Sequence, residues 1–152
     1  MRTFRIVLGV VLSLGVILAF GSPVTAGGRP LATVLNGGAE VPGPGDSNAS
    51  GTAFVTFNQG QGEVCYELTW ENIDGTVHRA HIHQAPVGVA GPIVVAFFEA
   101  QAFPGTGSDS NCIPDVDPAL IKDIRQHPDA FYVNIHSTPN FPAGAVRGQL
   151  DK

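Results

Sequence analysis

Hydrophobic and polar residues alternate along much of the chain, and the clearest example covers residues 63–70. One side of this segment carries the apolar residues Val64, Tyr66, Leu68 and Trp70. A period of two is typical of a β-strand with one buried face. Turn residues separate further short β-rich segments at 31–35, 52–57, 77–83, 93–98, 131–136 and 145–150. The pattern therefore predicts an antiparallel β-fold.

One segment departs from this alternation and predicts a short helix over residues 118–126. Asp117 offers a capping carboxylate directly before Pro118, and proline suits the first helical position because no N–H is needed there. His127 and Pro128 end the helix, and His127 complements the negative end of its dipole. The fold class that we predict is all-β, an antiparallel sandwich or Greek-key barrel with one short helix near 118–126.

Composition supports this class. The chain of 152 residues contains 19 Gly and 12 Pro, and only 14% of its residues are charged. Turn residues at this frequency argue against a helical bundle, and the plentiful Leu, Ile, Val and Phe argue against disorder. The length suits a single domain, which we place at residues 30–152.

The first 26 residues resemble a secretory signal peptide. Arg2 and Arg5 precede an apolar run at 6–20, and Val24-Thr25-Ala26 supplies the small residues that a signal peptidase requires. The alternative, an uncleaved anchor, needs about 20 apolar residues. We therefore expect cleavage after Ala26, no transmembrane segment in the mature chain, and a secreted protein that is extracellular, periplasmic or on the cell surface.

Charge narrows the range of partners. Removal of Arg2 and Arg5 takes the formal net charge from −5 to −7, and no basic cluster remains in the sequence. Phosphate-backbone binding requires such a cluster, so nucleic acid and an anionic membrane are excluded as expected partners. An extracellular protein or a cell-envelope component is expected instead, and the sequence does not identify it.

Cys65 and Cys112 are the two cysteines of the chain. In an oxidising compartment an even number of cysteines predicts a disulfide, with two free buried thiols as the alternative. Cys112 falls in a segment at 105–114 that we interpret as a loop. A bridge to Cys65 would hold this loop against the sheet.

Histidine provides the candidate chemistry. His81 and His83 share the non-core face of one predicted strand, and His136 takes the non-core face of another. Three imidazoles could bind copper or zinc, with Asn134 fixing the orientation of one ring. His78 has the opposite parity and would join only through a bulge. In the alternative interpretation, the histidines are merely hydrogen-bonded polar residues.

Motifs of known enzymes are missing from the sequence. It contains no G-x-S-x-G, no phosphate-binding glycine loop before Lys-Ser/Thr and no C-x-x-C. We therefore expect a protein without enzymatic activity.

Several motifs, taken together, resemble the chordin-type (CHRD) domain. They are the stretches at 35–42 (LNGGAEVP), 80–83 (AHIH), 91–95 (GPIVV), 132–136 (YVNIH) and 141–150 (FPAGAVRGQL). The resemblance spans about residues 31–151 and implies an extracellular, β-rich fold with no known reaction. The chain carries none of the cysteine-rich modules that flank this domain in chordin, so growth-factor antagonism is not expected to transfer.

A weaker resemblance links the chain to copper/zinc superoxide dismutases, which also have an H-x-H strand in a Greek-key barrel. The segment at 84–91 contains neither His nor Asp, so the zinc subsite of those enzymes cannot be built there. Dismutase activity is not expected, whereas a single copper-type site remains open.

Two charged residues lie in the motifs at opposite ends of the domain. We expect Glu40 and Arg147, or Arg147 with Asn36, to tie the first and last strands together as structural residues. The function expected overall is a secreted CHRD-type binding protein with one copper or zinc ion on His81, His83 and His136. Alternatives are a copper-type redox metalloenzyme and a structural envelope protein without metal.

Overall fold

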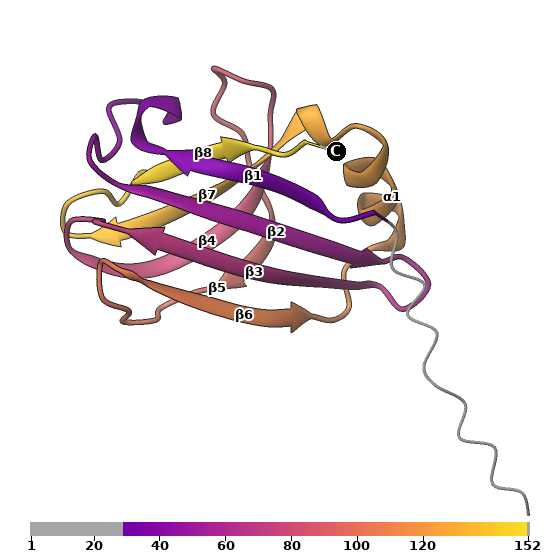
Figure 1. The fold of residues 1–152 in the computed structure, drawn as a ribbon. Helices are drawn as coiled ribbons and strands as arrows, with labels where there is room; N and C mark the ends of the chain where they lie inside the picture. Colours follow the sequence, from indigo (N-terminus) through magenta and orange to yellow (C-terminus); the bar gives the residue numbers. More distant parts are fainter. Residues whose placement is uncertain (1–28, 152) are drawn as a thin grey trace, which may run out of the picture.

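The computed structural model describes residues 29–151 (Figure 1), and the predicted signal peptide lies outside this part of the chain. The strands are β1 (Leu31–Asn36), β2 (Ser50–Asn58), β3 (Glu63–Glu71), β4 (Thr76–Gln84), β5 (Ile93–Phe98), β6 (Gly107–Ile113), β7 (Phe131–Thr138) and β8 (Val146–Gln149). The helix α1 covers Pro118–Gln126, and two 3₁₀ turns, η1 and η2, cover Gly37–Ala39 and Pro128–Ala130. The all-β class with one short helix is confirmed.

The strands form one antiparallel sheet in the order β5-β4-β7-β8-β1-β2-β3-β6. This sheet curls until its two ends approach each other, giving a nearly closed barrel. Tyr66 of β3 stacks on Phe97 of β5 with ring centroids 4.4 Å apart. The Tyr66 hydroxyl lies 3.3 Å from the Phe97 carbonyl oxygen and donates to Asp109 of β6 at 2.6 Å. Side chains thus join the end strands where the sheet does not close.

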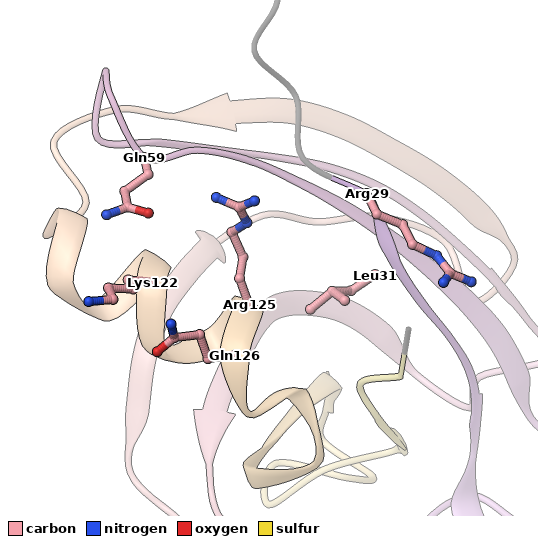
Figure 2. A pocket seen from close by; sticks show the side chains of 6 residues that line it. All are labelled: Arg29, Leu31, Gln59, Lys122, Arg125 and Gln126. Atoms are coloured by element: carbon pink, nitrogen blue, oxygen red, sulfur yellow. The ribbon is translucent and has the colours of Figure 1, made fainter.

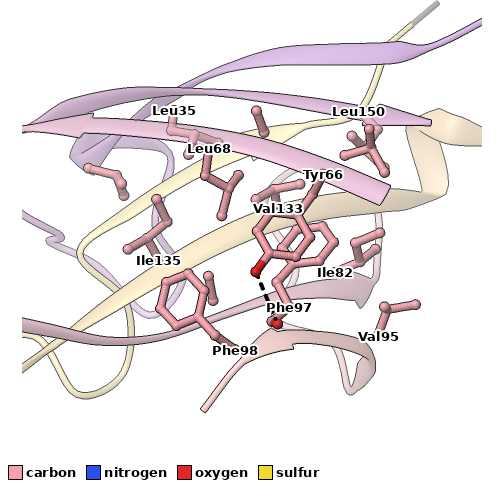
Figure 3. Close-up of a cluster of buried hydrophobic side chains, with 14 of the residues drawn as sticks. Leu35, Tyr66, Leu68, Ile82, Val95, Phe97, Phe98, Val133, Ile135 and Leu150 are labelled. Atoms are coloured by element: carbon pink, nitrogen blue, oxygen red, sulfur yellow. Dashed lines mark hydrogen bonds between the residues drawn. The ribbon is translucent and has the colours of Figure 1, made fainter. Parts of the chain in front are cut away.

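The inner face of the barrel holds the hydrophobic core (Figure 3). Residues that alternate along β3, β4 and β7, such as Leu68, Ile82 and Ile135, meet there. Ile121 and Ile124 of α1 are also fully buried, because residues three apart share one face of a helix. The helix begins as predicted, with the Asp117 carboxylate accepting a hydrogen bond from the Ala119 backbone N–H at 2.8 Å. None of the helices in residues 29–151 has the length and apolarity to cross a membrane.

The prediction of a loop at residues 105–114 is wrong, because most of this segment forms the edge strand β6. Its sequence, GSDSNCI, has polar residues on both faces and therefore lacks the alternation that marks a strand. Pairing with β3 holds it in place, from Val64 opposite Ile113 to Trp70 opposite Gly107. An edge strand with two solvated faces gives no hydrophobic signal in the sequence.

The predicted disulfide between Cys65 and Cys112 is present and joins β3 to β6. The two residues face each other in the strand register, so the bridge fastens the edge strand directly to its neighbour. A crosslink between residues 47 positions apart contributes about 2–4 kcal/mol of stability in loop-entropy treatments.

Two loops cover the outer face of the sheet around β4, β7 and β8. The segment after β4 is held by Arg147, whose guanidinium donates to the carbonyl oxygens of Val89 at 2.9 Å and Pro86 at 3.0 Å. The segment after β7 is held by Arg79, which donates to the Pro142 carbonyl oxygen at 2.7 Å. As a result, seven of the eight residues of β7 are buried, and both faces of this strand lie inside the protein.

Candidate metal centre

The pairing of β4 with β7 brings three histidines together on the covered outer face. His81 lies opposite Asn134 in the register, and His136 lies opposite Arg79, two residues along each strand. One ring nitrogen from each of His81, His83 and His136 lies within 4.8 Å of the other two. The shortest separation, 3.2 Å, joins Nδ1 of His81 to Nε2 of His136. The side chains project from the non-core face as predicted, but loops bury them to 0%, 8% and 5% exposure.

The second nitrogen of each ring has a fixed partner. Nδ1 of His83 donates to the Gly91 carbonyl oxygen at 2.9 Å, and Nδ1 of His136 donates to the Pro142 carbonyl oxygen at 3.2 Å. A carbonyl oxygen only accepts, so these contacts place the proton of each neutral ring on Nδ1. Nε2 of His81 lies 2.6 Å from a Glu99 carboxylate oxygen, which likewise calls for a donated N–H. The remaining nitrogens therefore carry lone pairs.

Burial keeps the three rings neutral. Loss of hydration lowers the pKa of His136 to about 3, with a further contribution from the neighbouring His81. The same desolvation lowers the pKa of His81 and His83, although the Glu99 carboxylate partly opposes it at His81. Neutral imidazole is the form that binds a metal ion. Nδ1 of His81 and Nε2 of His136 thus present two lone pairs to each other, while Nε2 of His83 is buried without a hydrogen-bond partner.

The other two histidines lie outside this cluster. His78 sits at a register shift between Val77 and Arg79, so a bulge does occur there, but His78 is not among the three grouped histidines. Its Nδ1 is buried and has no hydrogen-bond partner. His127 ends α1 and pairs with Asp123 at 2.8 Å in an exposed position.

The role expected of Asn134 is wrong. Its amide nitrogen donates to both carboxylate oxygens of Glu40, at 2.7 and 2.8 Å, and to no histidine. Burial of Glu40 outweighs this hydrogen bond and the nearby Arg147 charge, and it raises the pKa of Glu40 to about 7. The imidazoles are oriented instead by two backbone carbonyls and Glu99.

Arg147 contacts the first strand through the backbone and the cluster through an aromatic ring. In the register it lies opposite Asn36 of β1, and no ion pair joins it to Glu40 within residues 29–151. Its guanidinium carbon lies 3.4 Å from the centroid of the Tyr132 ring. The ring of His83 also packs on Tyr132: the two rings are nearly parallel, and their centroids lie 4.8 Å apart. Arg147 thus positions Tyr132, which in turn packs on a cluster histidine.

Glu99 is the contact residue that the sequence analysis missed. It directly follows β5, the edge strand that pairs with β4, and the β4–β5 register is irregular beside His81. Strand parity does not predict the direction of a side chain beyond such an irregularity. The only available signal was an acidic residue at the end of the strand adjacent to the H-x-H strand.

The fold and site define a class: a disulfide-bonded antiparallel β-barrel with a buried three-histidine cluster on the outside of its sheet. The sequence profile of the CHRD domain matches residues 31–150, and the chain belongs to the CHRD domain family. No curated protein matches the chain, and no solved structure does. CHRD domains are extracellular, and an oxidised cysteine pair fits that location.

Proposed function

We propose that this protein is an extracellular binding module that holds one transition-metal ion, copper or zinc, through His81, His83 and His136. The observation that carries the proposal is the orientation of the three rings. Each directs one nitrogen to a partner that requires a donated proton, and one nitrogen of each ring lies within 4.8 Å of one in each of the other two rings. Histidine ligands typically bind metal with their other N–H held in this way.

The distances suit a single ion. Two nitrogens bound at 2.0–2.1 Å and a tetrahedral angle are separated by about 3.3 Å. His81 and His136 are already 3.2 Å apart. Because the separations involving His83 are at most 4.8 Å, its ring has to approach by no more than about 1.5 Å.

The donor set favours copper or zinc. Neutral imidazoles suit these ions, and nitrogen sites generally bind Cu²⁺ more tightly than Zn²⁺. Three neutral ligands leave the positive charge of the ion uncompensated, and Glu99 supplies a nearby negative charge through His81. The low exposure of all three rings supports binding rather than catalysis, because a substrate would have to displace a loop to reach the ion.

Metal titration of the demetallated protein tests the proposal. We expect one Cu²⁺ or Zn²⁺ per chain by calorimetry and elemental analysis, and none in the His81→Ala/His83→Ala double variant. The His127→Ala variant is the matched control, because it removes an exposed imidazole outside the cluster. Near-ultraviolet circular dichroism of Trp70, a core residue, checks that each variant is folded.

Three results would contradict the proposal. Folded protein that binds no metal would leave histidines that serve only as hydrogen-bonded polar residues in a structural envelope protein. Equal affinity in the double variant would place the metal elsewhere. A copper absorption spectrum that is lost on reduction and returns in air, together with catalytic turnover, would instead indicate a redox enzyme.

Export completes the proposal. We propose that residues 1–26 direct secretion and are removed, which would deliver the chain to the oxidising compartment that the disulfide requires. Mass spectrometry of the secreted protein should give a chain that begins at Gly27. The acidic net charge supports a partner other than nucleic acid.

A further inference from the structure

A second site lies where α1 packs beside the start of β1 and the turn after β2 (Figure 2). Its cavity has a volume of about 360 Å³. The lining residues are Arg29, Leu31, Gln59, Lys122, Arg125 and Gln126. Three of the six are cations, two are amides, and neither Asp nor Glu is among them. In this view, Arg125 projects from the helix between Gln59 and Arg29.

The cations of the protein concentrate here. Residues 29–151 contain five Lys and Arg side chains in a chain with a net charge of −5. Arg79 and Arg147 are engaged by backbone carbonyl oxygens on the covered face. The other three all line the cavity, and none has a hydrogen bond or ion pair within the described residues.

Ordinary helix electrostatics does not explain this arrangement. Arg125 lies in the last turn of α1, where a cation complements the helix dipole. Lys122 precedes it by three residues and so shares its face, and Arg29 comes from a different part of the chain. Three like charges around one cavity repel each other unless a negative group lies between them.

We propose that this cavity binds the phosphate or sulfate ester of a sugar-sized molecule. Cations recognise such oxyanions through charge-assisted hydrogen bonds. A volume of about 360 Å³ lies at the lower end of the range for small-molecule sites, so it holds an oxyanion together with about one sugar ring. The amides of Gln59 and Gln126 both donate and accept hydrogen bonds, as sugar hydroxyls require.

Titration of the full-length mature protein with glucose 6-phosphate, glucose 6-sulfate and glucose, followed by amide NMR, tests this proposal. We expect both esters to shift the signals of Gln59 and Arg125, and the phosphate ester to bind more tightly because its charge is larger. Uncharged glucose should bind far more weakly. Raising the salt concentration should weaken ester binding, because screening acts on exposed charges.

Variants separate the cavity from the overall charge. Lys122→Gln/Arg125→Gln should weaken ester binding about tenfold or more, because two charge-assisted contacts are lost. Ser108→Asp/Ser110→Asp makes the same change in net charge on the exposed edge strand β6 and should leave the affinity unchanged. Arg29→Gln removes one charge outside the helix and should also weaken ester binding. Equal affinity for glucose, equal loss in both double variants, or no shifts at about 10 mM ester would overturn the proposal.

Discussion

Strands β2 and β3 belong to the same sheet as β7, but their outer faces meet different surroundings. Along β2 and β3 buried and solvent-facing residues alternate, and the hydroxyls of Thr52 and Thr69 bond across the exposed face at 2.7 Å. On β7 the outer residues Tyr132, Asn134 and His136 are buried, nearly to the same extent as the core residues between them. We call the exposed outer face around β2 and β3 the open side of the barrel, and the buried outer face around β7 the covered side.

The difference shows where this fold keeps its chemistry. A polar side chain on the open side is satisfied by water, whereas one on the covered side needs a partner within the protein. Glu40, Arg147 and Tyr132 find such partners. The three histidines find partners for one nitrogen each, and the three rings are grouped with ring nitrogens within 4.8 Å of one another. The covered side is therefore where a bound ion would complete the structure.

The first prediction compares the effect of one substitution on the covered side with that of one on the open side. Tyr132→Ala, on the covered side, should lower the free energy of unfolding by about 3–5 kcal/mol because it removes a buried ring that packs on His83 and Arg147. Val34→Ala, on the open side at 67% exposure, should change it by less than about 0.5 kcal/mol. Denaturant titration measures both, and comparable losses would mean that the two sides do not differ as described.

Glu40 gives the covered side a pH dependence. Its pKa is about 7 in the folded protein and 4.5 as a model value, so the folded state holds an extra proton between these values. The Glu40 contribution to the free energy of unfolding should therefore fall by about 3 kcal/mol as pH rises from 4.5 to 7. Histidines with lowered pKa act in the opposite direction over part of this range.

The Glu40 contribution is therefore measured as the difference in the free energy of unfolding between the protein and a Glu40 variant. Denaturant titration of the protein and of Glu40→Gln at several pH values isolates the Glu40 contribution, because the histidines are common to both. We expect the variant to become relatively more stable as pH rises. A difference that does not change between pH 4.5 and 7 would mean that Glu40 titrates normally.

Arg147→Met tests whether the covered side depends on its cation. The variant keeps much of the packing volume but leaves the carbonyl oxygens of Val89 and Pro86 without a donor. We expect a loss of about 2–3 kcal/mol, in keeping with hydrogen bonds from a charged group. Arg125→Met, which removes an unpaired cation from α1, should cost less than about 0.5 kcal/mol. Equal melting temperatures for Arg147→Met and the parent would show that the contact is superficial.

The smallest predicted effect concerns the acidic partner of the cluster. Glu99→Gln removes a negative charge 2.6 Å from Nε2 of His81 and should weaken metal binding about tenfold, a typical result for a residue that orients a ligand. Glu67→Gln, on the open side, is the matched control. Competition with a chelator of known affinity measures both variants. The same affinity in all three proteins would remove Glu99 from the site.

The sequence predicted the open side better than the covered side, and burial explains why. Alternation along residues 63–70 and the Asp117 cap depend on local rules, and both are confirmed. Strand parity also placed His81, His83 and His136 on one outer face, where the structure groups them. The loops over that face are specified by tertiary contacts, so the Asn134–Glu40 pair and the role of Glu99 could not be inferred. The strand β6 escaped notice because neither of its faces is apolar.

The central claim is that one metal ion binds to three imidazoles on the covered side. X-ray absorption spectroscopy of the protein loaded with one equivalent of Zn²⁺ tests it most directly. We predict a first shell with three imidazole nitrogens at about 2.0–2.1 Å, and no imidazole shell in His81→Ala/His83→Ala, which should not bind the ion. A first shell of oxygen atoms alone, or the same imidazole signal in both proteins, would contradict the claim.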